Sequence, residues 1–257
     1  MRRIRAQIIA ACLAFAAAVQ PNPVGAQEAV RLEDRAKIEL TDTKGFLNLN
    51  GVWTVEMWVR PLGEKTGEVA LMGDDCWKGM SAELSPAGAQ GWTLRLNAVR
   101  NVNQRTLDLT MAGSSPGKRK PRWIRLVSQP LTMPEKPVWN HIAIVKQVGI
   151  ITVFLNGDPL MAQSVAGLRF HPAPTNLFLG IRRHTVPTRS SNADYGALRI
   201  TDRVRYTRKF KPQKVFQKDG RTVLLLDFNV GQGGVVPDTG GGGHHGLIDG
   251  GEWLDDA

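Results

Sequence analysis

Polar and apolar residues alternate with a period of two along much of this chain, and the 3.6-residue period of an amphipathic helix is hard to find. The segment 106–111 reads Thr, Leu, Asp, Leu, Thr, Met, and 53–60 places Trp, Val, Met and Val at every second position. The segment 92–96 repeats this pattern with Trp92, Leu94 and Leu96. Each pattern predicts a strand with one face buried and the other turned outward.

The clearest local signal is Asn156-Gly157, which lies between two strand-like runs at 150–155 and 158–162. Both residues tolerate the positive φ of a type I′ turn, so we expect a tight hairpin. Further strands are expected at 139–146, 177–180, 195–200 and 223–228. About a dozen short strands without a long helix predict an all-β sandwich or barrel.

The first residues form a basic, apolar leader: Arg2, Arg3 and Arg5 precede an apolar run at 8–19, and Ala26 offers a small residue for cleavage. We predict a signal peptide at 1–26 and an exported protein, periplasmic or extracellular. No later stretch approaches the roughly 20 apolar residues of a transmembrane helix. Residues 27–257 are expected to form one domain.

Composition supports a globular chain: 42% of the 257 residues are hydrophobic, 22% are charged, and there are only 2 Cys. This balance excludes a disordered chain, a collagen and a disulfide-stapled miniprotein. After removal of the leader only Cys76 remains, so no intramolecular disulfide is expected. Prolines at 113–137 predict a long basic excursion, and the glycines at 231–251 predict a loop.

Four segments together resemble the laminin G-like, concanavalin A-like jelly-roll domains of secreted bacterial proteins. They are 46–61 with its Trp-Thr-Val-Glu-Met-Trp-Val-Arg-Pro run, 139–158 with Trp-Asn-His-Ile-Ala and Leu-Asn-Gly, 177–207, and 228–246. The resemblance implies an antiparallel two-sheet jelly-roll sandwich. Asn229 departs from the family's usual Asp, and the Phe-Asp-x-Gly segment closes this chain, whereas it opens many members.

Related jelly rolls include glycoside hydrolases, but the sequence argues against an enzyme. Retaining glycosidases need two carboxylates about 5 to 5.5 Å apart, and the Glu-x-Asp-x-x-Glu signature is missing. Glu56 has no second carboxylate beside it and is expected to face solvent or a basic neighbour. The letters Gly-x-Ser-x-Gly occur at 113–117, but Pro116 and Pro121 forbid the helix of a nucleophile elbow.

No cofactor or metal is expected. Calcium is left open, because Asp74, Asp75, Asn192 and Asp194 lie in or beside predicted loops, but their spacing does not support a site. The pair His244 and His245 lies in a Gly-rich turn and makes a poor chelate.

The net charge of +10 and two runs of cations, at 118–125 and 203–218, favour an anionic partner. Nucleic acid is disfavoured because no nucleic-acid fold signature accompanies the charge. Loop aromatics could stack on sugar rings, and cations at the end of the 177–180 strand could donate hydrogen bonds. The candidate ligand-binding residues are Arg182, Arg183, His184, Trp77, Trp123, Arg119 and Arg122.

The sequence therefore predicts an exported, non-catalytic module that recognises a glycan or a partner protein through its rim loops. One alternative is a structural subunit of a periplasmic or envelope assembly that docks an acidic protein or membrane surface through its basic residues. A third is a polysaccharide-active enzyme. The oligomeric state does not follow from the sequence.

Overall fold

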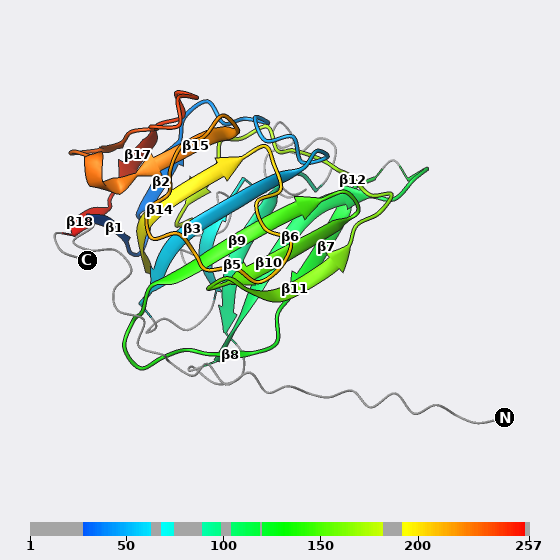
Figure 1. Cartoon of the computed structure of the whole chain (residues 1–257), viewed down its shortest axis with the longest axis horizontal. Coiled ribbons are helices and arrows are strands. Elements are labelled where there is room, and N and C mark those ends of the chain that lie inside the picture. The colour runs from blue at the N-terminus through cyan, green and yellow to red at the C-terminus, as the bar shows by residue number, and fades with distance from the viewer. Residues whose placement is uncertain are drawn as a thin grey trace.

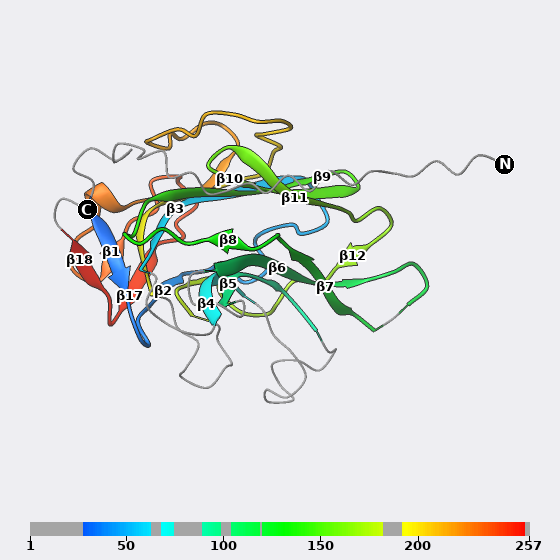
Figure 2. The same cartoon turned by 90° about the horizontal axis from the view of Figure 1, so that it is seen from below.

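Two antiparallel β-sheets stack face to face in the computed structural model of the chain, which confirms the predicted two-sheet sandwich (Figures 1 and 2). The structure describes residues 28–62, 68–74, 89–98, 104–118, 120–181 and 192–254. Among these residues, no helix is long and apolar enough to cross a membrane. The helical structure in the described part is a short 3-10 turn, Phe228–Val230.

Sheet A has eight strands, in the order β11-β10-β9-β3-β14-β1-β18, with β15 also paired to β14. Their bounds are β1 (Ala29–Leu32), β3 (Trp53–Pro61), β9 (Asn140–Gln147), β10 (Ile150–Leu155), β11 (Asp158–Ser164), β14 (Ala193–Thr201), β15 (Thr222–Asp227) and β18 (Glu252–Leu254). The β10–β11 turn is the predicted hairpin, with φ of 52° at Asn156 and 85° at Gly157.

Sheet B has ten strands, in the order β12-β6-β5-β4-β13-β2-β17-β16, with β7 and β8 also paired to β6. Their bounds are β2 (Lys37–Leu40), β4 (Glu68–Gly73), β5 (Trp92–Ala98), β6 (Gln104–Ser114), β7 (Arg122–Val127), β8 (Leu131–Thr132), β12 (Arg169–Phe170), β13 (Phe178–Leu179), β16 (Val235–Val236) and β17 (Gly246–Asp249).

The core lies between the sheets and is built from the apolar positions that the alternation identified. On β3 these are Trp53, Val55, Met57 and Val59, all at most 1% exposed. The ring of Trp53 lies 6.5 Å from that of Trp92 in sheet B, so the two sheets meet through aromatic contact at this point. Burial of each such side chain contributes about 1.5 to 3 kcal/mol.

The outer face of sheet A is also covered, by the connection between β14 and β15. This segment, residues 202–221, is called the strap below, and it forms the uppermost layer of the molecule in Figure 2. Backbone carbonyls of the strap accept hydrogen bonds from sheet A: Trp58 Nε1 donates to Gln213 at 2.9 Å, and Thr54 Oγ1 donates to Arg203 at 2.8 Å. The sandwich therefore has a third, irregular layer on one side.

The two ends of the described chain meet at one edge of the molecule. In sheet A, β1 pairs with β18, so that Val30 lies opposite Trp253. In sheet B, β2 pairs with β17, so that Ile38 lies opposite Ile248. Both sheets are thus completed at this edge by strands from opposite ends of the chain.

Two segments for which the sequence predicts no strand, the excursion at 113–137 and the loop at 231–251, contain strands. The segment 113–137 holds β7 and β8, because Ile124 and Leu126 alternate with polar residues and enter the core despite the flanking prolines. The segment 231–251 holds β16 and β17, because its consecutive glycines are confined to one turn at 240–243. Most of the basic run at 118–125 therefore belongs to a hairpin of sheet B.

Candidate functional site

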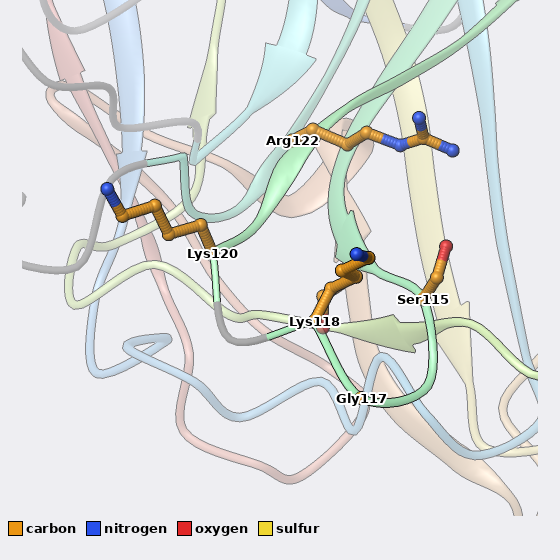
Figure 3. A pocket seen from close by; sticks show the side chains of 6 residues that line it. Ser115, Gly117, Lys118, Lys120 and Arg122 are labelled. Carbon is orange, nitrogen blue, oxygen red and sulfur yellow. The ribbon is translucent and has the colours of Figure 1, made fainter.

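A basic pocket lies at the end of the β6–β7 hairpin, with a volume of about 480 Å³ (Figure 3). Its lining residues are Ser114, Ser115, Gly117, Lys118, Lys120 and Arg122. Strand β6 supplies the first of these and β7 the last, and the other four belong to the connecting loop. The pocket is therefore built from one short piece of chain supported by a sheet.

The turn at the tip of the hairpin fixes the shape of this pocket. Lys118 donates its backbone N–H to the Ser115 carbonyl at 3.0 Å, and Gly117 has a φ of 74° between them. A left-handed residue at this position favours glycine. The turn places the Lys118 ammonium between two groups of side chains: the Ser115 hydroxyl and the Arg122 guanidinium lie on one side, and the Lys120 ammonium lies on the other (Figure 3).

The pocket is cationic, because three of its six lining residues are Lys or Arg and none is acidic. Within the described residues, the side chains of Lys118, Lys120 and Arg122 take part in no salt bridge. Hydrogen-bond donors with free positive charge suit carboxylate, sulfate or phosphate groups. The pocket can therefore bind an anion without first breaking an internal ion pair.

Ser114 links the pocket to the neighbouring strand. Its hydroxyl lies 2.9 Å from Nε2 of His171, which follows β12. Burial, together with the charge of Arg169, lowers the pKa of His171, so the imidazole is held neutral. This contact fixes the Ser114 side chain at the base of the hairpin.

Trp123 and Arg125 lie on the outer face of sheet B, on the strand that supplies Arg122 to the pocket. They alternate along β7 with Ile124 and Leu126, which enter the core. Arg125 Nε donates to the buried carboxylate of Asp108 at 2.6 Å, and this hydrogen bond raises the pKa of Arg125. Arg125 is thus paired within the molecule, and the half-buried indole of Trp123 lies on the same face of the sheet.

Comparison with known proteins identifies the fold family. The family model described as the concanavalin A-like lectin/glucanases superfamily matches residues 32–208, more than half of the chain. The chain belongs to this superfamily. No curated protein matches the chain in sequence.

A solved structure shares the fold of this superfamily member, and two others show a weaker similarity. A candidate carbohydrate-binding protein from Bacteroides ovatus has a TM-score of 0.62 at 14% identity, and the match covers 91% of this chain and 61% of that chain. The CBM40 module of a Ruminococcus gnavus sialidase has a TM-score of 0.47 at 13% identity, over 70% of this chain and 92% of that one. The enzymatically active domain of bacteriophage CBA120 tailspike protein 2 has a TM-score of 0.48 at 15% identity, over 76% and 27%.

Residues from the segments that carry the resemblance meet in a buried cluster beneath the strap. Glu56 on β3 is fully buried, and its carboxylate accepts hydrogen bonds from Arg199 Nε at 2.9 Å, His141 Nε2 at 3.1 Å and the Tyr206 hydroxyl at 2.8 Å. Arg205 Nε lies 3.6 Å from the same carboxylate. The expectation of a basic neighbour for Glu56 is confirmed, and the alternative of a solvent-facing residue is wrong because the strap covers it.

The charge of Glu56 is retained in this buried site. Burial by itself raises the pKa of a carboxyl group, but the hydrogen bond from His141 and the charge of Arg199 outweigh it and lower the pKa of Glu56. Arg199 also donates to the carbonyl of Gln217 at 2.9 Å and lies 4.7 Å from the Phe216 ring. The cluster joins sheet A to the strap and leaves no surface for a substrate.

The structure places Asp194, expected in or beside a loop, on β14 and gives the described acids and histidines other partners. Asp194 is fully buried between Arg31 at 2.8 Å and Arg60 at 2.7 Å. Asp238 accepts the backbone N–H of His244 at 3.1 Å, and its own N–H donates to Nδ1 of His245 at 3.1 Å. In the described ranges, no group of three or more His, Cys, Asp or Glu residues could hold a metal ion.

Of the sequence-predicted site residues, Arg122 lines the pocket, and Trp123 follows it on β7 with its side chain on the other face of the strand. Sequence reasoning missed Ser114, Ser115 and the two lysines as site residues, although the lysines belong to the basic run at 118–125. The other predicted site residues lie outside the described residues, as do the leader 1–26 and Cys76; they are Trp77, Arg119, Arg182, Arg183 and His184.

Proposed function

We propose that this chain is a non-catalytic binding module that takes an acidic glycan at the β6–β7 pocket. The observation that carries this proposal is the composition of the pocket: three cations that form no salt bridge with a described residue, two serine hydroxyls and no acidic side chain among the six lining residues. A carboxylated or sulfated sugar supplies both an anion for the cations and hydroxyls for the serines.

Two further observations support a sugar as the ligand. Trp123, the residue after Arg122 on β7, is half-buried on the outer face of the sheet, where an indole face can pack against a sugar ring. The similarity in fold to a candidate carbohydrate-binding protein, with a TM-score of 0.62, agrees with this class of ligand. The pocket belongs to a loop at the end of a hairpin, which is the kind of rim position expected for a binding module.

The chemistry of the described residues supports binding without catalysis. Glu56 is sealed beneath the strap, and the pocket contains no carboxylate that could act as a glycosidase acid or base. The Ser114–His171 pair has no acidic side chain hydrogen-bonded to the imidazole in the described part of the chain. We place the module outside the cytoplasm, periplasmic or extracellular, on the strength of the leader at 1–26.

The experiment is a binding titration by calorimetry against alginate and heparin, with dextran as the neutral polysaccharide. The variant is Lys118→Gln/Lys120→Gln/Arg122→Gln. The matched control is Arg35→Gln/Lys44→Gln/Lys136→Gln, which removes the same charge from exposed cations elsewhere that have no ion pair.

We expect an acidic polysaccharide to bind and dextran not to bind. The pocket variant should bind the acidic chain at least about tenfold more weakly, because three charge-assisted contacts are removed, whereas the control variant should bind as the wild type does. Equal binding by the wild type and the pocket variant would overturn the proposal.

The second candidate function is a structural subunit of an envelope assembly that docks through a basic surface. The observation that favours it is the excess of cations on the strap, which lies on the other sheet from the pocket.

A further inference from the structure

The strap is the outermost layer on its side of the molecule and is held firmly against sheet A (Figure 2). Besides the carbonyl contacts of Gln213 and Arg203, Phe210 donates its backbone N–H to the Gly157 carbonyl at 3.0 Å. Tyr206 and Phe210 pack against buried Phe154 of β10. A segment fixed in this way presents its outward side chains to solvent in a stable arrangement.

Ion pairing divides the charges of the strap into two groups. Residues 202–221 contain eight Lys or Arg residues and two Asp residues. Four cations have carboxylate partners: Arg203 and Arg205 pair with Asp219, Lys209 pairs with Asp158 at 2.7 Å, and Arg221 pairs with Asp202 at 3.2 Å.

The other four cations of the strap are exposed and have no carboxylate partner in the described part of the chain. They are Arg208, Lys211, Lys214 and Lys218. No carboxylate of the described residues therefore neutralises their positive charge, which lies along a layer that nothing described covers. Such a surface attracts an extended anionic partner.

The apolar residues of the strap distinguish between kinds of anionic partner. All three aromatic side chains face the sheet: Phe216 is 6% exposed, and Tyr206 and Phe210 pack against buried side chains. Tyr206 and Phe210 are partly buried by these contacts and by stacking on each other at 3.5 Å, so no ring of the strap offers a fully open face for stacking on a sugar or a base. Val215, in contrast, is 53% exposed and lies next to Lys214 in the sequence. An exposed aliphatic side chain among free cations suits the headgroup region of a bilayer.

We propose that the outer side of the strap docks onto a lipid bilayer surface that carries anionic headgroups. The free cations interact with lipid phosphates, and Val215 inserts among the headgroups. The proposal is independent of the glycan pocket, because it depends on different residues in a different layer.

The test is co-sedimentation of the full chain with vesicles of phosphatidylcholine containing phosphatidylglycerol, compared with vesicles of phosphatidylcholine alone. We expect binding to the anionic vesicles that weakens as salt is added, because the attraction is screened. The variant is Lys211→Gln/Lys214→Gln/Lys218→Gln, and Arg35→Gln/Lys44→Gln/Lys136→Gln is its control of equal charge.

Each cation near an anionic surface strengthens binding about fivefold, so the strap variant should bind about a hundredfold more weakly. The control variant should lose far less, and urea unfolding should show both variants to be folded. Equal losses of vesicle binding in the two variants would mean that net charge alone drives binding. Undiminished binding by the strap variant would mean that another surface contacts the bilayer. Either result overturns the proposal. Binding to heparin or DNA without binding to anionic vesicles would also overturn the proposal. Failure of glycan binding would leave these outcomes unaffected.

Discussion

Replacing Glu56 with glutamine is the most direct test of the buried cluster beneath the strap. The substitution keeps the size of the side chain and removes its charge, so Arg199, which is 1% exposed, loses its buried counter-charge. Removing one partner of a buried ion pair typically costs about 3 to 5 kcal/mol. Arg199 keeps the carbonyl of Gln217 and the ring of Phe216, so we expect a loss near the lower limit, about 3 kcal/mol.

The assay is urea unfolding of the full chain near neutral pH, followed by tryptophan fluorescence and analysed by linear extrapolation. Asp158→Asn is the matched control, because it removes the partner of Lys209 from an ion pair on the surface of the strap. The side chains of Asp158 and Lys209 are 59% and 74% exposed, so the free energy of unfolding of the control should fall by less than about 1 kcal/mol.

A double-mutant cycle adds a second criterion. Because Glu56 and Arg199 are in direct contact, the double variant Glu56→Gln/Arg199→Met should lose at least about 1 kcal/mol less than the sum of the single variants. Additive losses, or a loss below about 1 kcal/mol for Glu56→Gln alone, would refute the argument that the cluster holds the strap on the sheet.

Three further predictions concern the same layer. The pKa of Glu56 in the folded state is lowered from its ordinary value of 4.5. The ionised carboxylate therefore stabilises the folded state fully above pH 4.5, and this stabilisation is lost as the pH falls through the pKa of the folded state. The free-energy difference between wild type and Glu56→Gln should therefore shrink below about pH 4 in a pH series of urea titrations. Tyr206→Phe removes the 2.8 Å hydrogen bond to the Glu56 carboxylate and should cost about 1.5 to 3 kcal/mol in the same assay; no measurable loss would contradict this. Gly157 and Gly45 both have a positive φ, but only at Gly157 would an added Cβ overlap the Phe210 carbonyl. The Gly157→Ala variant should therefore melt at a clearly lower temperature than the Gly45→Ala variant. Equal melting temperatures would count against a close approach of the strap to this turn.

The fold could be predicted largely because local alternation determines which side chains face the core. Trp53 and Trp92 were placed on apolar faces from their own segments, and the structure brings those faces together. The strand containing Ile124 and Leu126 shows the alternation, but the prolines on both sides of it favour a loop, so the sequence did not predict it. Here the apolar pattern was the better guide, since the prolines lie outside the strand itself.

The candidate site was predictable only in part. Arg122 and Trp123 were selected from a run of cations and a loop aromatic, but the pocket depends on how the turn at Gly117 arranges the chain. The buried cluster could not be derived locally. The partners of Glu56 lie 85 to 150 positions away in sequence, so a single acid on a strand gave no sign of them.

The pairing of β1 with β18 and of β2 with β17 determines when both sheets can finish folding during synthesis. Val30 leaves the ribosome about 220 residues before its partner Trp253 is synthesised. Until then, the nascent chain has an unpaired strand edge in each sheet, and such edges template intermolecular pairing. A stop codon placed after residue 245 would remove β17 and β18 together, so one short truncation would expose both layers of the sandwich to aggregation.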